Sequence, residues 1–447
     1  MKKTWDAACK ATRSYWNSKW YMPSVLAVSC ISAVFDIDLI GMFVLAALVI
    51  VMLVLCDDMM SLVCPIFCIF LSSIEFYRDY SVLTDYMWYA IVPFAAAFIF
   101  NLVYYRTPFV KGRFFYPQLA VSVALSLGGL FCIPAKQYFS PSALYFTVGS
   151  GFFMLFVYCL TISRLKAYKR SYDRVERLAR TMFAAGLLAA FLVFEFYIDN
   201  AEEFLRKGTF LFFKPRNYVS SVLMMAIPMS CIYIKRNNLN IISMLFMYVG
   251  MLLTGSRSGL LFGTLALALS VAFVYITNKK SRRLYNVLLI IAAIPVVYAA
   301  VKVLPELYAA RMANGFFNEG DATRIKFIKF GISDFLAYPI FGIGVGNLAH
   351  FEIFKAYVPG SIVYFHNIVI QVMASLGVVG IAAYLWNFCA RVKMFWENRK
   401  NETLIFAISY LAILLMSFTN PGIFCPFPEG ALIVLMLSVA EVKFAKQ

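Results

Sequence analysis

The chain has 447 residues, 62% of them hydrophobic, with a mean hydropathy of +0.78 and a formal net charge of +17. This composition excludes an ordinary soluble enzyme and indicates a polytopic membrane protein, because a soluble core of this size needs far fewer apolar residues. Nucleic-acid binding would need the basic residues gathered on one folded face, with aromatic residues between them. They lie instead in short segments between apolar runs, so we expect no nucleic-acid partner.

Apolar stretches long enough to cross a membrane recur along the whole chain. Spanning a bilayer takes about 20 apolar residues in a helix, and backbone in lipid must satisfy its own hydrogen bonds, so we expect an all-α transmembrane bundle. Fourteen candidate spans follow in order: roughly 22–35, 39–56, 59–75, 86–103, 116–133, 144–162, 181–198, 218–234, 241–254, 260–277, 285–302, 364–387, 404–418 and 429–442. Because the first two are barely separated and 241–254 is short, the sequence predicts twelve to fourteen spans.

Basic residues orient this bundle through the positive-inside rule. With the N-terminus in the cytoplasm, the cytoplasmic segments contain 27 of the 40 basic residues. These segments are 1–20, 104–115, 163–180, 235–240, 278–284, 388–403 and 443–447. The positive excess therefore lies on the cytoplasmic side, where it can contact anionic lipid. We expect a multi-pass protein of the cytoplasmic membrane with both termini inside the cell.

Two long loops are predicted on the opposite, outer face. One covers residues 199–217, and the other, of about sixty residues, covers 303–363. Loops beyond about fifteen residues are usually functional or disordered. The second loop is rich in aromatic residues and has isoleucines at helical spacing, so we expect two or more short helices lying on the outer surface.

Three arginines lie at or near this predicted outer boundary: Arg216, Arg257 and Arg324. Any one of them could simply extend from a helix end toward the membrane surface, and that reading stays open. Arg257, however, lies in the turn Thr254-Gly-Ser-Arg-Ser-Gly259, where glycines allow close backbone approach and serines supply hydroxyl groups. Because a guanidinium can hold a phosphate through two parallel hydrogen bonds, several such arginines suit a pyrophosphate-bearing lipid.

A glycine-rich run follows the third arginine. It contains Gly342, Gly344 and Gly346, and it is similar to part of a dinucleotide-binding fingerprint. We reject a nucleotide site, because no buried strand precedes the run. Pro339 is expected to end the preceding helix. The glycines then permit a tight bend that positions the outer loop over a substrate, and Asn347 can cap the structure that follows.

His366 is one of only two histidines in the chain. Asn367 follows it, and Gln371 lies one turn further, so polar groups enter an otherwise apolar helix. A hydrogen-bonded histidine at a helix end is the alternative reading. An imidazole with a pKa near 6.5 can take a proton from an acceptor hydroxyl near neutral pH, which favours a general base. His350 lies in a loop and is predicted to be a surface residue.

Metal ligands are scarce in this sequence. The ten cysteines are scattered, mostly within apolar runs, and they form no Cys-x-x-Cys pair. Together with two histidines they predict neither a metal site nor a cofactor, although a divalent ion bound by carboxylates remains an alternative.

Four motifs occur in a characteristic order. They are Thr254-Gly-Ser-Arg-Ser-Gly-Leu260, then Arg324 followed by Tyr338-Pro-Ile-Phe-Gly-Ile-Gly-Val-Gly-Asn347, then His366-Asn-Ile-Val-Ile-Gln371, and Gly377-Val-Val-Gly380. In this order they resemble the O-antigen ligase and O-antigen polymerase superfamily of integral-membrane glycosyltransferases. The resemblance covers residues 210–385, a little under half of the chain.

This resemblance implies a C-type glycosyltransferase-like fold, with the large outer loop before the third-last span. It implies an undecaprenyl-diphosphate-linked glycan as donor and a glycan or lipid-linked acceptor, joined by metal-independent transfer with inversion. It assigns His366 as general base and Arg216, Arg257 and Arg324 to the donor diphosphate, Arg216 on the shortest motif. Membrane lipid and a chain-length regulator are further candidate partners.

Two alternatives to a polymerase remain at this stage. A ligase of the same superfamily would move the glycan to another acceptor, and a flippase or transporter of lipid-linked oligosaccharide would belong to another class. We favour a polymerase, because no feature demands a specialised acceptor and the predicted spans have few charges at their centres. We divide the chain into an N-terminal transmembrane half (1–198), a catalytic transmembrane region (199–387) and a C-terminal transmembrane hairpin (388–447).

Overall fold

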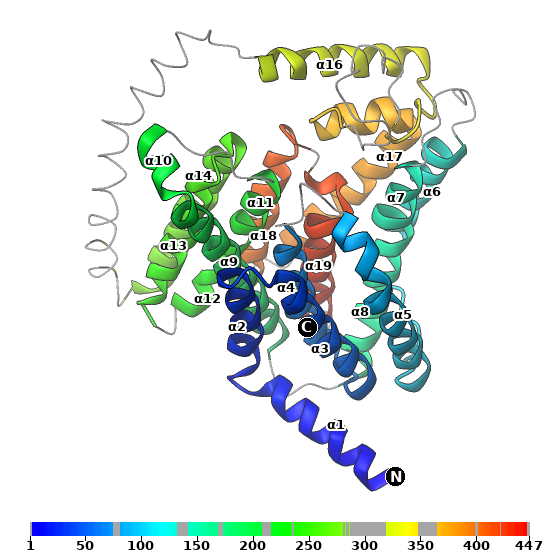
Figure 1. Ribbon diagram of the computed structural model, residues 1–447. Coiled ribbons are helices and arrows are strands. Elements are labelled where there is room, and N and C mark those ends of the chain that lie inside the picture. Colours follow the sequence, from blue (N-terminus) through cyan, green and yellow to red (C-terminus); the bar gives the residue numbers. More distant parts are fainter. Residues whose placement is uncertain are drawn as a thin grey trace.

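The structure is a computed structural model that describes most of the chain. The described residues are 2–74, 81–131, 142–168, 173–207, 216–234, 237–279, 282, 286, 319–346, 364–397, 401–420 and 422–444. Within these ranges the regular structure is helical and contains no strand. Most of the helices run up or down a single bundle, while α1 projects from one end and α16 lies across the other (Figure 1).

The first half of the chain forms helices joined mostly by short connections. They are α1 (Lys2–Asn17), α2 (Tyr21–Val34), α3 (Asp38–Leu55), α4 (Met60–Ser72), α5 (Ser81–Tyr104), α6 (Phe115–Leu125), α7 (Ser142–Phe146), α8 (Met154–Ala167), α9 (Arg174–Asp199) and α10 (Ala201–Lys207). Two π-helical segments, Ser126–Phe131 and Thr147–Phe153, continue α6 and connect α7 to α8.

The second half supplies the remaining helices. They are α11 (Arg216–Ala226), α12 (Ser230–Ile234), α13 (Asn240–Leu253), α14 (Arg257–Thr277), α16 (Glu319–Ala337), α17 (Ile368–Glu397), α18 (Asn401–Met416) and α19 (Ala431–Phe444). A short 3-10 turn (Ile227–Met229) joins α11 to α12, and two irregular turns (Gly422–Phe424 and Pro426–Gly430) join α18 to α19.

Seven helical stretches among the described residues are long and apolar enough to cross a membrane. They are Asp38–Leu55, Asp85–Tyr104, Ala143–Ala167, Arg174–Asp199, Arg216–Ile234, Arg257–Thr277 and Ile368–Glu397. Shorter apolar helices accompany them at Tyr21–Val34, Met60–Ser72, Asn240–Leu253 and Thr403–Met416. These helices confirm the predicted all-α polytopic membrane fold. Every predicted span coincides with a helix except 285–302, of which the structure describes only residue 286.

The core is packed around α9 and α11. Gly186 and Gly250 let these helices and α13 approach closely, since a side chain at Gly186 would overlap Ala226 and one at Gly250 would press on Ala190. Small residues at helix contacts are typical of membrane bundles, where apolar burial alone does not drive association. The helix α11 is therefore held at the centre, and its first residue is Arg216.

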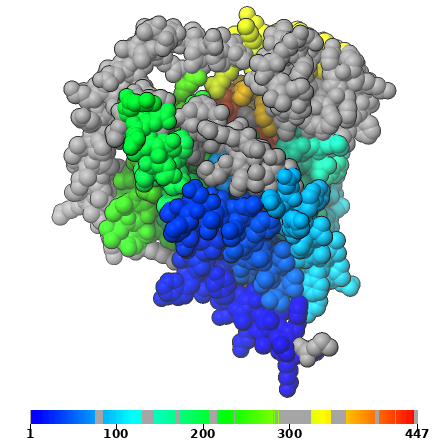
Figure 2. All heavy atoms as spheres, in the orientation of Figure 1, coloured from blue at the N-terminus to red at the C-terminus, as the bar shows by residue number. Residues whose placement is uncertain are grey.

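The two ends of the bundle differ. The N-terminal helix α1, rich in basic residues, projects at the end opposite to α16 (Figures 1 and 2). At that end the Arg113 backbone N–H donates to Glu441 in α19, and Arg177 donates to the Trp16 carbonyl in α1. This gathering of basic residues agrees with the positive-inside prediction, and the side of the membrane stays a prediction.

The long second loop of the sequence prediction is partly described. Its central part forms one helix, α16, of 19 residues, which packs against α17. Residues 303–318 and 347–363 lie outside the described residues, so the expectation of two or more short helices remains a prediction.

Candidate functional site

The N-termini of α11 and α14 lie side by side, and each helix begins with a predicted diphosphate-binding arginine. Arg216 opens α11 and Arg257 opens α14. The residue after Arg216 bonds to the residue before Arg257, so the two arginines begin adjacent helix ends. Because the N-terminus of a helix carries partial positive charge, two such ends with two arginines form a favourable environment for an anion.

Serine and asparagine side chains fix this pair of helix ends. Ser256 caps α14 by accepting a hydrogen bond from the Gly259 N–H at 3.1 Å, and its hydroxyl donates to Asn217 Oδ1 at 2.9 Å. A side chain at Gly259 would crowd Ser220 on α11. The predicted serine–arginine turn is therefore a helix cap that also contacts the residue after Arg216.

A turn that the sequence analysis did not single out reaches the same place. Asn420, 3% exposed, lies just after α18. Its Oδ1 accepts a hydrogen bond from Asn217 Nδ2 at 2.9 Å, and its Nδ2 donates to Ser258 Oγ at 2.7 Å. The one amide thus joins the first turn of α11 to the first turn of α14.

The other side of this turn holds the predicted catalytic segment. Asn367 Nδ2 donates to the Phe418 carbonyl at 3.1 Å, and the Ile368 N–H donates to the Ser417 carbonyl at 2.8 Å. Residues 417–420 therefore lie between the Arg216–Arg257 pair and His366.

Asn367 is the N-cap of α17. Its Oδ1 accepts from the Val369 N–H at 3.0 Å and from the Ile370 N–H at 3.2 Å, which satisfies two backbone donors at the start of the helix. Asn367 therefore fixes the start of α17 next to His366, and its supporting role in the site stays a prediction.

His366 has an unusual backbone conformation. Its φ is 53°, and among the described residues only one other non-glycine residue, Asp36, has a positive φ. Such a conformation typically costs about 1–3 kcal/mol and persists only where its surroundings impose it. Here Gln371 Oε1 accepts from the Phe365 N–H at 2.9 Å on one side, and Asn367 anchors the chain on the other. Gln371 thus holds the backbone of the residue that precedes the histidine.

The imidazole of His366 lies against α16. Its ring centroid is 5.8 Å from that of Phe327, which is fully buried, and its Nδ1 is buried without a hydrogen-bond partner in the described part of the chain. His366 lies two residues before α17, outside the spanning helix. Burial, and then the positive charge of Arg324, lower the pKa of His366 from 6.5 to about 4. The imidazole is therefore neutral at pH 7.

The glycine-rich run packs against a break in α17. Gly377 interrupts that helix with φ 61° and ψ −155°. The Ile343 N–H donates to the Ala374 carbonyl at 2.9 Å, and the Val378 N–H donates to the Pro339 carbonyl at 2.8 Å, on either side of the break. The run therefore satisfies backbone groups that the broken helix leaves open.

Glycine is required where these two backbones meet. Gly342, Gly344 and Gly346 all have positive φ, and a side chain at Gly342 would overlap the backbone at Ser375. The predicted tight bend is present, and its contact is with α17. Asn347 lies outside the described residues.

Four of the predicted residues thus form two groups. Arg216 and Arg257 make one, and Arg324 and His366 make the other, with the turn at 417–420 between them. Within the described residues no group of three or more histidine, cysteine or acidic side chains is placed to hold a metal ion.

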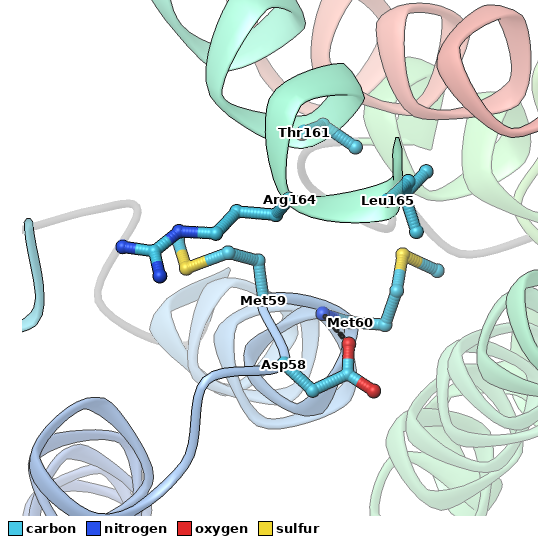
Figure 3. Close-up of a pocket in the computed structure, with 6 residues that line it drawn as sticks. All are labelled: Asp58, Met59, Met60, Thr161, Arg164 and Leu165. Atoms are coloured by element: carbon cyan, nitrogen blue, oxygen red, sulfur yellow. Dashed lines mark hydrogen bonds between the residues drawn. The ribbon is translucent and has the colours of Figure 1, made fainter. Parts of the chain in front are cut away.

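A small pocket at the other end of the bundle belongs to the scaffold. It is lined by Asp58, Met59, Met60, Thr161, Arg164 and Leu165 (Figure 3). The Asp58 carboxylate accepts from the Met60 N–H and from the Trp16 indole, and Arg164 donates to Asn101. These polar groups join α1, α4, α5 and α8, so their role is structural.

Comparison with known proteins identifies the region that contains most of this site. Residues 242–385 match the family described as O-antigen ligase, and a search of curated proteins finds no match. The matched region contains Arg257, Arg324, the glycine-rich run, His366 and Asn367, while Arg216 and Asn420 lie outside it. The resemblance inferred from the motifs is confirmed over this region.

Proposed function

We propose that this polytopic membrane protein, whose residues 242–385 match the family described as O-antigen ligase, joins undecaprenyl-diphosphate-linked oligosaccharide repeats on the outer face of the cytoplasmic membrane. One observation carries the proposal: the residue after His366 and the residues after the two helix-opening arginines all bond to the same turn, 417–420. A base and an anion site are the two groups that glycosyl transfer from a diphosphate requires.

The arginines hold the donor in this proposal. Arg216 and Arg257 bind the diphosphate, because paired guanidinium groups and two helix ends match its negative charge and its oxygens. As the bond between the anomeric carbon and the diphosphate oxygen breaks, the departing oxygen gains charge and interacts more strongly with the arginines. The arginines thereby supply the charge stabilisation that a metal ion provides in other transferases.

His366 activates the acceptor. Its neutral imidazole takes the proton of the acceptor hydroxyl while the acceptor oxygen bonds to the anomeric carbon from the side opposite the diphosphate, so the anomeric configuration inverts. A pKa near 4 makes a weak base in the free enzyme. Arg324 is the second cause of that low pKa, so a bound diphosphate that offsets its charge raises the pKa of His366. The base is thus strongest when the donor is in place.

The experiment is glycan transfer by purified protein in proteoliposomes that contain the lipid-linked donor. We expect His366→Ala to lower the transfer rate about 10²–10⁴-fold, the usual contribution of a general base. Arg257→Lys should also lower it, because lysine lacks the planar fork of donors. The control is His350→Ala, at the predicted surface histidine. Unchanged polymer length and yield in inserted His366→Ala protein would overturn the assignment.

The same assay separates a polymerase from a ligase. A polymerase extends one lipid-linked glycan with another, so a ladder of products forms from the donor alone. A ligase needs a different acceptor added to the vesicles. We favour the polymerase, and a product that forms only with an added acceptor would assign the ligase instead.

A further inference from the structure

A polar seam joins the C-terminal helices to α11. Along one face of α11, at one-turn spacing, Asn217 bonds to Asn420, Ser221 donates to Glu429 at 2.8 Å, and the Met225 carbonyl accepts from Ser409 at 2.8 Å. The C-terminal partners are all buried. In an apolar bundle such contacts fix both the position and the rotation of a helix, because an unsatisfied polar group there is costly.

The outermost contact of this seam differs from the other two. Ser221 bonds to Glu429 and to the Tyr218 carbonyl of its own helix, and the Met225 carbonyl bonds to Ser409, whereas Asn217 belongs to a directional chain that crosses three segments. The Ser256 hydroxyl donates to Asn217 Oδ1, Asn217 Nδ2 donates to Asn420 Oδ1, and Asn420 Nδ2 donates to Ser258 Oγ. Only a side chain that both accepts and donates in fixed directions can hold this place.

We propose that Asn420 is a positioning residue that sets the separation of Arg216 and Arg257, and so the fit of the donor diphosphate. The proposal rests on the proposed function of the arginine pair. Asn420 touches the residue after each arginine: Asn217 on α11 and Ser258 on α14. If it is removed, the two helix ends lose their common partner, and the guanidinium groups no longer keep one spacing.

The turn that contains Asn420 also bonds to the two residues that follow His366. Phe418 and Ser417 accept hydrogen bonds from Asn367 and Ile368, while the Ser417 hydroxyl accepts from the Ile423 N–H at 2.9 Å. The turn is thus hydrogen-bonded to the first turns of α11 and α14, to the start of α17 and to the residues that follow it. Asn420 lies beyond residue 385, so the segment that aligns the two groups of the site is outside the O-antigen ligase match.

The test compares Asn420→Ala with Asn387→Ala. Asn387 is equally buried, at 3% exposed, and also makes an amide–amide hydrogen bond, to Gln118 at 3.2 Å, but it lies well along α17 and away from the arginines. The probe is undecaprenyl diphosphate, whose binding is measured without catalysis. We expect Asn420→Ala to weaken its binding about tenfold or more and to raise the donor KM, since small misplacements of binding groups have large effects. Asn387→Ala should stay near wild type in both. Equal binding by the two variants would overturn the proposal.

Asn420→Asp gives a second measurement if the alanine variant does not fold. The carboxylate keeps the shape of the amide and still accepts from Asn217, but it places a negative charge beside the arginine turn. We expect the donor KM to rise about tenfold or more with a smaller change in kcat, because the carboxylate competes with the diphosphate for the guanidinium groups. A changed kcat with an unchanged KM would contradict the positioning role. If wild type binds the probe but transfers no glycan, the proposed function fails on its own.

Discussion

At His366 the backbone and the side-chain environment both favour a neutral imidazole held in one orientation. The residue was predictable as a candidate from its rarity and its neighbours, as were Arg257 and Arg324 from their motifs. Its strained φ of 53° and its contact with α16 were not, because they depend on packing between distant segments. Asn420 was missed for the same reason: Asn-Pro-Gly predicts a turn and nothing more, and its partner Asn217 is 203 residues away.

The low pKa of His366 predicts the pH at which the transfer rate falls on the acid side of the pH–rate profile. In the free enzyme kcat/KM should remain flat as the pH falls below 6.5 and should decline near pH 4, where the imidazole becomes protonated. Arg324→Gln removes the second cause of the shift, so its acid limb should move toward 6.5 while burial keeps it below that value. A pH–rate profile checks this, and a limb at 6.5 in both proteins would contradict it.

The same pKa shift makes the free energy of unfolding depend on pH, because protonation of His366 is coupled to folding. Because the pKa of His366 is lower in the folded protein than in the unfolded chain, its contribution to stability is complete above pH 6.5. It is lost as the pH falls toward 4, since the unfolded chain then binds the proton more readily.

Asn367 has two separable tasks, which two substitutions distinguish. Asn367→Ala removes the cap of α17 and should lower the free energy of unfolding by about 1 kcal/mol. Asn367→Asp keeps the cap acceptors but cannot donate to the Phe418 carbonyl. We therefore expect the aspartate variant to recover the melting temperature but not the transfer rate. Full recovery of both would show that the link to the turn is dispensable.

At the scale of helices, hydropathy predicted positions well and irregularities poorly. A window of apolar residues detects length, so 364–387 was expected as one uniform span. The structure begins α17 at Ile368, breaks it at Gly377 and continues it to Glu397. The π-helical segments 126–131 and 147–153 were likewise not predicted, because their composition is as apolar as that of the helices they extend.

The break in α17 can be tested with two glycines of similar φ. Gly377 has φ 61° and faces the Ile340 and Pro339 carbonyls, whereas Gly255 has φ 67° and no atom within 4 Å of the place that a Cβ would take. Gly255→Ala should lower the free energy of unfolding by about 1 kcal/mol through strain alone. Gly377→Ala adds steric overlap and should lower it by about 3 kcal/mol or more. Thermal unfolding in detergent measures both, and equal shifts would argue against the docking of the glycine-rich run.

At the scale of the molecule, the bundle has one end rich in basic residues and another that carries the candidate site. The charge pattern predicts which end faces the cytoplasm. The charge pattern does not show which residues outside the O-antigen ligase match contact those inside it. The structure shows that Asn217 and Asn420, both outside the match, bond to Ser256 and Ser258 inside it.

Sidedness can be measured with single cysteines in a background without native cysteines. Lys3 in α1 and Lys329 in α16 are both exposed, and these two helices lie at opposite ends of the bundle (Figure 1). In intact cells whose outer barrier is permeabilised, Lys329→Cys should react with an impermeant thiol reagent, and Lys3→Cys should react only after the cytoplasmic membrane is opened. The reverse pattern would invert the predicted topology.

The central claim is that His366 acts in the chemical step on a donor held by the arginines. The measurement that tests it most directly is the single-turnover transfer rate of His366→Ala at saturating lipid-linked donor, alongside equilibrium binding of undecaprenyl diphosphate. We predict a rate reduced about 10²–10⁴-fold, with binding within a few fold of wild type. Transfer at the wild-type rate by a protein that binds the donor normally would contradict the account.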